Sequence, residues 1–326
     1  MITMVIALTL VTVALAVVSG LNDGGVLLAL ATRYAVIPLG WFLGIVCVSL
    51  VAGPLLFGVT VAQTLVTGLF ASEPGADLAF LIGTVLALLV VWQLTRLGLP
   101  TSLTLALVGG LTGAAAGAGL TTDWASIGRV LLIGLAAPVV SLVVARYVGR
   151  FLEAWGYGAK GVGIFRLLHV GAFTAQCLAY SINDGQKVLA VAAVAVAGIP
   201  AAPSLLDPAR RWWLVLALLV VTPLFAVGMI LSLRRVTRRI GRELAVLRPV
   251  DAVAAEAVGA GAVFVSSALG APVSMSQSVA AAVVGSASSK GVGRVRWDSA
   301  ARIGMAWVVT LPASGLLAFV LGWVTR

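Results

Sequence analysis

Long apolar runs alternate with short polar connections along the whole chain. The runs lie near residues 2–32, 35–71, 78–95, 99–118, 127–146, 163–200, 210–233, 252–269, 270–289 and 303–324. Because a helix needs about 20 apolar residues to cross the hydrocarbon layer of a membrane, each run is a candidate for one crossing. The pattern predicts an all-α polytopic membrane protein with ten crossings, five in each half of the chain.

The composition supports a membrane protein and excludes several other classes. Of the 326 residues, 61% are hydrophobic and 10% are charged, whereas a soluble domain is about 25% charged. Two cysteines, Cys47 and Cys177, and a single histidine provide neither a disulfide framework nor a histidine-rich metal site. The net charge of +10 does not indicate nucleic-acid binding, because lysine and arginine cluster at the ends of the apolar runs.

The distribution of positive charge predicts the orientation in the membrane. Cytoplasmic connections of membrane proteins are enriched in lysine and arginine. No Lys or Arg occurs between Tyr34 and Thr95, and the connection 72–77 within this stretch is acidic, whereas 234–248 holds six arginines. We therefore expect 72–77 outside the cell, 234–248 in the cytoplasm, both termini outside, and a multi-pass location in the cell membrane.

Two motifs occur once in each half. The first is Gly20-Leu21-Asn22-Asp23-Gly24, which returns as Ser181-Ile182-Asn183-Asp184-Gly185. The second is Gly98-Leu99-Pro100-Thr101-Ser102, which returns as Gly270-Ala271-Pro272-Val273-Ser274. Residues 1–160 and 161–326 are thus expected to be two transmembrane repeats. The odd number of crossings in each half and the opposite charge of matched connections predict inverted topology, which is the architecture of secondary transporters.

The Asn-Asp motif lies in the middle of an apolar run in both halves. Glycines beside an Asn-Asp pair predict a broken helix, and a carboxylate inside the membrane is a candidate functional group. Oxygen atoms of Asn22, Asp23, Asn183 and Asp184 suit a hard cation such as Na⁺, and the carboxylates also accept a proton. The alternative is that each pair caps a helix at the membrane surface.

The Gly-x-Pro motif followed by hydroxyl residues predicts a helix start. Proline suits the first turn, and serine or threonine suits the N-cap. A helix N-terminus inside the membrane offers free N–H groups and partial positive charge to an oxyanion. Hairpins that carry such starts from both halves are therefore expected to meet at a midplane site. The alternative is a packing interface lined by Ser and Thr.

Together the motifs resemble those of the inorganic phosphate transporter (PiT) family, which repeats Gly-Ala-Asn-Asp and Gly-Leu-Pro-Val-Ser-Thr-Thr-His. Here Leu105 and Gln277 replace the closing histidines, and Val26 replaces a second Asn after the first Asn-Asp. The resemblance implies phosphate ligands at Thr101, Ser102, Thr104, Ser274, Ser276, Gln277, Asp23, Asp184 and Lys187. It implies cation ligands at Asn22, Asp23, Asn183 and Asp184. Lys187 is either a charge partner of an intramembrane Asp or a direct anion ligand.

The expected function is a secondary active symporter, not an enzyme, which takes up inorganic phosphate with Na⁺ or H⁺ and needs no cofactor. Another oxyanion such as sulfate is the alternative substrate. Two rivals are a channel for oxyanions and an intramembrane enzyme that acts on phosphorylated lipid headgroups. Such an enzyme would need a general base or a metal cluster near the motifs, and the sequence shows neither there. The sequence leaves the oligomeric state open, with a homodimer as one alternative.

Overall fold

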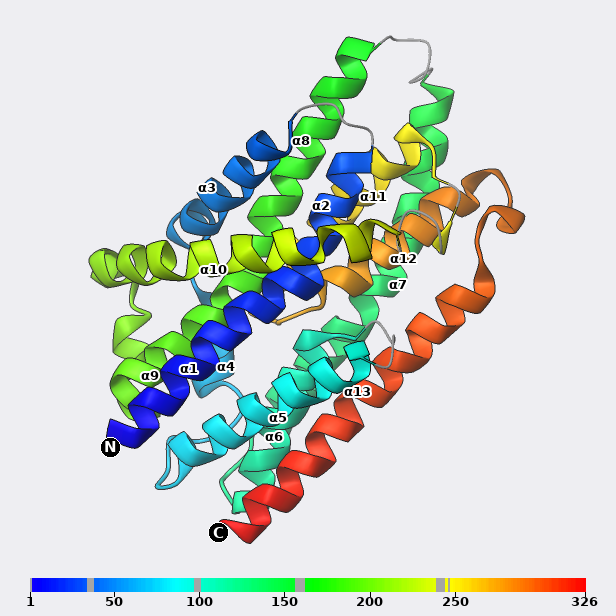
Figure 1. Ribbon diagram of the computed structural model, residues 1–326. Helices are drawn as coiled ribbons and strands as arrows, with labels where there is room; N and C mark the ends of the chain where they lie inside the picture. The colour runs from blue at the N-terminus through cyan, green and yellow to red at the C-terminus, as the bar shows by residue number, and fades with distance from the viewer. Residues whose placement is uncertain (1, 34–37, 97–100, 156–161, 239–243, 246) are drawn as a thin grey trace.

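The computed structural model describes residues 2–33, 38–96, 101–155, 162–238, 244–245 and 247–326. The described chain is all-helical apart from two isolated β-bridges. Figure 1 shows both termini at the same end of the helix bundle. The helices are α1 (Ile2–Ser19), α2 (Gly25–Arg33), α3 (Leu39–Phe57), α4 (Thr60–Thr67), α5 (Ala76–Arg96), α6 (Leu103–Ala118), α7 (Trp124–Ala154), α8 (Val162–Tyr180), α9 (Gln186–Leu205), α10 (Arg211–Arg238), α11 (Pro249–Ala268), α12 (Met275–Ala287) and α13 (Trp297–Val324).

Eight helical segments of the described chain are long and apolar enough to cross a membrane, so this is a multi-pass membrane protein. They are Ile2–Thr32, Leu39–Phe57, Ala76–Arg96, Trp124–Ala154, Gly163–Leu205, Arg211–Ser232, Pro249–Ala268 and Trp297–Val324. The prediction of ten crossings is wrong for two segments, 99–118 and 270–289. Their helices α6 and α12 have 16 and 13 residues, or about 24 and 20 Å at 1.5 Å per residue, which is short of the hydrocarbon thickness of about 30 Å.

Each short helix is the second arm of a helical hairpin. α5 packs on α6, and α11 packs on α12. A bridge between Phe70 and Thr122 closes the base of the first hairpin, and a bridge between Ala245 and Val295 closes the second. Hydrogen bonding to Thr121 at the first base also lowers the pKa of the Glu73 carboxyl. The two ends of each hairpin therefore lie side by side.

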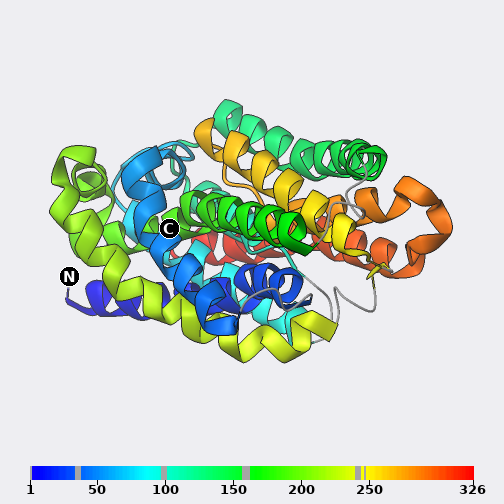
Figure 2. The same ribbon diagram turned by 90° about the horizontal axis from the view of Figure 1, so that it is seen from above.

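The last long helix of each half packs against the hairpin of the other half. α13 lies along α6, and α7 lies along α12; Figure 2 shows α11 and α12 beside α7. Equivalent glycines allow both contacts. A Cβ added to Gly113 would lie 2.1 Å from the carbonyl oxygen of Gly315, and one added to Gly285 would lie 2.0 Å from that of Leu142. These positions need glycine because the partner atoms are backbone.

We expect Gly113→Ala to destabilise the protein by about 1–3 kcal/mol, which is the usual cost of overpacking a tight contact. The measurement is the midpoint of thermal unfolding of the purified protein in detergent. Gly128→Ala, on α7 with no atom near the added Cβ, is the matched control and should leave the midpoint unchanged or slightly raised. Equal midpoints for both variants would show that α6 and α13 separate without cost.

The predicted broken helices are continuous, which corrects the sequence interpretation. Gly20–Gly24 and Ser181–Gly185 are single π-helical turns, which join α1 to α2 and α8 to α9. A π turn keeps the backbone hydrogen-bonded while it changes the direction of the side chains, so it avoids exposing unpaired N–H and C=O groups inside a membrane. The Asn-Asp pairs thus sit on bulges within helices.

Large apolar side chains cover the outer surface of the long helices. Leu132 and Leu135 on α7 are 70% and 63% exposed, and Val308 and Leu316 on α13 are 75% and 67% exposed. Contact of such an apolar surface with lipid acyl chains is favourable, whereas its exposure to water costs free energy. The predicted boundary between the two repeats, at residues 160 and 161, lies outside the described residues, as do Gly98, Leu99 and Pro100.

Candidate phosphate and cation site

The two Asn side chains tie each π turn to the tip of the hairpin in its own half. Asn22 Nδ2 donates to the carbonyl of Thr101 at 3.2 Å. Asn183 holds Val273 at two points, since its Nδ2 donates to the Val273 carbonyl at 2.7 Å and its Oδ1 accepts from the Val273 N–H at 3.1 Å. Thr101 and Val273 occupy the same position of the repeated Gly-x-Pro motif. The two motifs of each half therefore form one unit.

Contacts between the halves bring these two units together. The N–H of Ser276, at the start of α12, donates to Asp23 Oδ1 at 3.0 Å. The hydroxyl of Thr104, at the start of α6, donates to the carbonyl of Val273 at 2.7 Å. We call the resulting group of ten residues the central cluster; its members are Asn22, Asp23, Thr101, Ser102, Thr104, Asn183, Asp184, Lys187, Ser274 and Ser276.

A buried ion pair lies within the central cluster. Lys187 Nζ is 2.8 Å from Asp184 Oδ1, and both side chains are at most 1% exposed. The same ammonium donates to Thr104 Oγ1 at 2.5 Å and to the Val273 carbonyl at 3.0 Å. Of the two roles that the sequence left open for Lys187, the structure shows the charge-partner geometry. Asp23 has no ion-pair partner among the described residues.

The hydroxyl groups at the hairpin tips organise the two helix starts. Ser102 Oγ accepts from the N–H of Leu105, and Ser274 Oγ accepts from the N–H of Gln277, so both are N-caps. The hydroxyl of Thr101 is buried without a hydrogen-bond partner among the described residues. Two capped helix N-termini that meet inside an apolar protein supply partial positive charge for an oxyanion.

Burial is uneven across the central cluster. Asp23, Ser102, Asn183 and Asp184 have no exposed surface, and Gln277 beside the cluster is 3% exposed. Asn22 and Ser276 are partly exposed, and both contact Asp23. The predicted site residues thus come together, with the more accessible side next to the first π turn.

A second buried polar pair lies outside the central cluster. Nδ1 of His169 on α8 is 2.9 Å from Oε2 of Glu256 on α11, and its Nε2 is 3.2 Å from the carbonyl of Ala31. The ring of Phe165 stacks on the imidazole at a centroid distance of 5.6 Å. The sequence did not predict that His169 pairs with Glu256, because the two residues belong to different helices with no shared motif.

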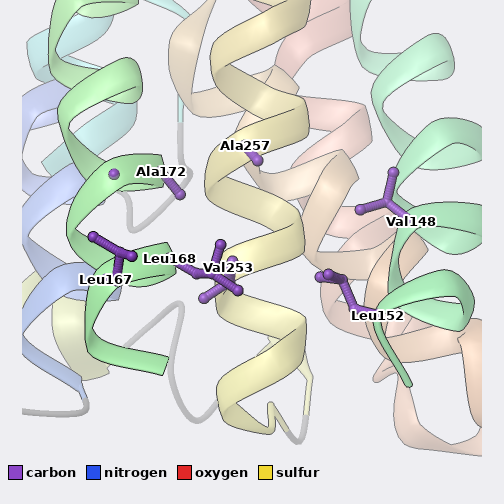
Figure 3. Close-up of a pocket in the computed structure, with 8 residues that line it drawn as sticks. Val148, Leu152, Leu167, Leu168, Ala172, Val253 and Ala257 are labelled. Atoms are coloured by element: carbon purple, nitrogen blue, oxygen red, sulfur yellow. The ribbon is translucent and has the colours of Figure 1, made fainter. Parts of the chain in front are cut away.

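A pocket of 410 Å³ lies between α7, α8 and α11 and shares no lining residue with the central cluster (Figure 3). Apolar side chains line it, among them Val148, Leu152 and Val253, and Leu167 at its rim is 72% exposed. A dehydrated oxyanion needs hydrogen-bond donors and positive charge, which such a lining does not offer. The central cluster remains the candidate site.

Comparisons with known proteins agree with the repeated architecture. The sequence matches the profile of the phosphate transporter family twice, over residues 19–161 and 153–318. A solved structure described as "The sodium-dependent phosphate transporter" has the same fold, with a TM-score of 0.77 over 99% of both chains at 19% sequence identity.

Curated relatives carry the name "Probable low-affinity inorganic phosphate transporter". The one from Mycobacterium bovis is 30% identical over 81% of this chain and 64% of its own length. The Mycobacterium leprae protein is 29% identical over 73% of this chain and 58% of its own length, and the Rhizobium meliloti protein is 28% identical over 81% and 79%. The chain thus spans about three-fifths of the length of the two mycobacterial relatives. The matches confirm the resemblance seen in the motifs, and the chain belongs to the phosphate transporter family.

Proposed function

We propose that this protein is a secondary active symporter that takes up inorganic phosphate across the cell membrane together with Na⁺. The observation that carries the proposal is the central cluster, in which two capped helix N-termini and two Asn-Asp pairs meet at one buried point. The helix starts suit an oxyanion, and the carboxylates suit its coupling cation. Family membership supports phosphate, and the name of the matched structure supports Na⁺.

The proposed roles follow the geometry. Phosphate binds between the helix starts, with Thr101, Ser102, Thr104, Ser274, Ser276 and Gln277 around it. Asp23 and Asp184, with the amide oxygens of Asn22 and Asn183, serve the cations. Because a phosphate ion carries one or two negative charges, it leaves water for this site only when positive charge accompanies it. Cation binding and phosphate binding thus strengthen each other, which is the basis of symport.

The test is uptake of radiolabelled phosphate by proteoliposomes that contain the purified protein. An inward Na⁺ gradient should drive accumulation of phosphate above its external concentration, and unlabelled sulfate should compete weakly. Accumulation driven by a pH gradient in Na⁺-free medium would assign the coupling to H⁺ instead. Stronger competition by sulfate than by phosphate would assign another oxyanion, and equilibration without accumulation would indicate a channel.

We expect Ser274→Ala to weaken the apparent affinity for phosphate about tenfold, since a lost hydrogen bond in a buried site costs about 1–3 kcal/mol. The measurement is the concentration dependence of initial uptake. Asp123→Ala is the matched control because Asp123 caps α7 on the surface, where it accepts from the N–H of Ser126. If both variants keep the original affinity, Ser274 serves only as a cap.

We further propose that residues 1–160 and 161–326 are inverted repeats, which alternate access to the central cluster. Because the two ends of each hairpin lie side by side, we infer that neither hairpin adds a net crossing. Each half holds four of the eight candidate spans, and without the first arm of its hairpin three net crossings remain. This odd number inverts the second repeat. Single cysteines at Glu73 and at Lys290, in a variant without Cys47 and Cys177, should react with an impermeant reagent from opposite sides of the membrane. Labelling of both from one side would overturn the inverted arrangement.

A further inference from the structure

The two π turns differ at one position that bears on coupling. Three residues after the Asp, the first half has Val26 and the second half has Lys187. On a helix, residues three apart lie on one face, so each side chain is a neighbour of its Asp. Val26 and Lys187 are both buried, at 6% and 1% exposed. The repeats therefore place an apolar group beside Asp23 and a positive charge beside Asp184.

The surroundings of the Lys187 ammonium are those of a bound cation. A lysine ammonium has three N–H donors. Here three oxygen atoms receive them: a carboxylate oxygen of Asp184, the hydroxyl of Thr104 and the carbonyl of Val273, at distances of 2.8, 2.5 and 3.0 Å. Carboxylate, hydroxyl and carbonyl oxygens are also the ligands that a hard metal cation takes. The donors are all used, so the ammonium makes no further hydrogen bond without losing one of these.

The matching contact in the first half has no fixed cation. Thr104 and Ser276 hold equivalent positions in the two hairpins. Asp23 reaches Ser276 directly through the Ser276 N–H, whereas Lys187 stands between Asp184 and Thr104. The described residues include no ion-pair partner for Asp23. The more exposed members of the cluster, Asn22 and Ser276, flank the same carboxylate, so an ion from solution reaches Asp23 more readily than Asp184.

We propose that the Lys187 ammonium permanently fills, in the second repeat, the place that a mobile coupling cation takes at Asp23 in the first, so that one mobile cation accompanies each phosphate. The proposal rests on the symport function above. Two carboxylates and one ammonium leave a single negative charge in the cluster. One cation at Asp23 neutralises it before phosphate arrives, and a second cation has no unpaired carboxylate to bind.

The experiment counts cations per phosphate at static head, in proteoliposomes with the membrane voltage clamped at zero. A tenfold inward Na⁺ gradient supports about tenfold accumulation of phosphate for one coupled cation and about hundredfold for two, because each factor of ten is the same free energy of about 1.4 kcal/mol. Wild type should accumulate phosphate about tenfold. If the coupling ion is H⁺, a pH gradient of one unit in Na⁺-free medium replaces the Na⁺ gradient.

The informative variant is Lys187→Asn, which removes the fixed charge and leaves an oxygen ligand. It should bind two radioactive Na⁺ ions per chain in equilibrium dialysis, where wild type binds one, and its uptake should become steeper in Na⁺. Val26→Asn introduces the same residue at the equivalent position beside Asp23 without removing a charge, and as the matched control it should keep a count of one. Lys187→Met, close to lysine in length, is the second variant, and Na⁺ should raise its unfolding temperature more than that of wild type, which binds one Na⁺ fewer.

The outcomes separate this proposal from the proposed function. If wild type shows no accumulation with either cation gradient, the symport function itself is wrong. If wild type accumulates phosphate but couples two cations, or if folded Lys187→Asn still binds one, only the role of Lys187 is wrong. Should neither Lys187 variant fold, the wild-type count decides the question, since two cations per phosphate contradict a fixed cation.

Discussion

Asp23→Asn is expected to abolish the accumulation of phosphate against its gradient while leaving the protein folded. The substitution keeps the size of the side chain and an oxygen that still accepts from the N–H of Ser276, which is 3.0 Å from Asp23 Oδ1. It removes the negative charge that, in the proposed mechanism, recruits the coupling cation. Coupling free energies between sites are typically about 1–3 kcal/mol, and loss of that energy reduces the transporter to one that equilibrates phosphate slowly or not at all.

The measurement is the ratio of internal to external phosphate in proteoliposomes under a cation gradient, with the unfolding temperature as a check on folding. Asp298→Asn makes the same chemical change on an exposed part of α13, and this control should accumulate phosphate as wild type does. If Asp23→Asn still accumulates phosphate with unaltered cation dependence, then Asp23 only caps the start of α12, and the coupling site lies elsewhere.

Breaking the buried pair of Asp184 and Lys187 is expected to destabilise the protein by about 3–5 kcal/mol, because either single substitution leaves one buried charge without its partner. Lys187→Met and Asp184→Asn should each lower the unfolding temperature in Na⁺-free detergent solution. The double variant removes both charges, so its loss of stability should be smaller than the sum of the two single losses.

The control for this pair is an ion pair of the same type at the surface. Lys290 lies 3.3 Å from Glu153 with 57% of its side chain exposed, and such pairs contribute at most about 1 kcal/mol. Lys290→Met should therefore leave the unfolding temperature nearly unchanged. Additive losses for Asp184→Asn and Lys187→Met would mean that the two charges do not depend on each other.

Much of the fold could be predicted from the sequence because lipid leaves the backbone few alternatives. A long apolar run inside a membrane must be helical to pair its own N–H and C=O groups, so the apolar runs predicted the helices, and repeated motifs predicted the two halves. The lengths of the segments near 99–118 and 270–289 were predicted wrongly. Side chains such as those of Thr101 and Val273 are also common in helices that face lipid, so the sequence did not reveal that these two residues lie in hairpin tips buried in protein.

The candidate site was predicted in its members but not in its connections. From residue types and matched spacing, the sequence predicted that Asn22, Asp23, Asn183 and Asp184 belong to one site. The structure places all four in the central cluster. Their roles in binding remain predictions. The sequence predicted unwound backbone at Gly20–Gly24, whereas π turns keep the helix intact. Glycine and asparagine are compatible with unwound backbone and with a π turn, and the close packing of neighbouring helices favours the continuous helix.

The sequence by itself determined the class of protein, the repeated design and the residue types of the site, since apolarity, motif recurrence and charge distribution are properties of a linear chain. Only the tertiary structure decided which charges pair. Val26 and Lys187 hold equivalent places along the chain, but Lys187 has a defined role only because Asp184, Thr104 and Val273 come within 3.0 Å of its ammonium. Residues from both hairpins make that contact, and no local pattern encodes the distance between them.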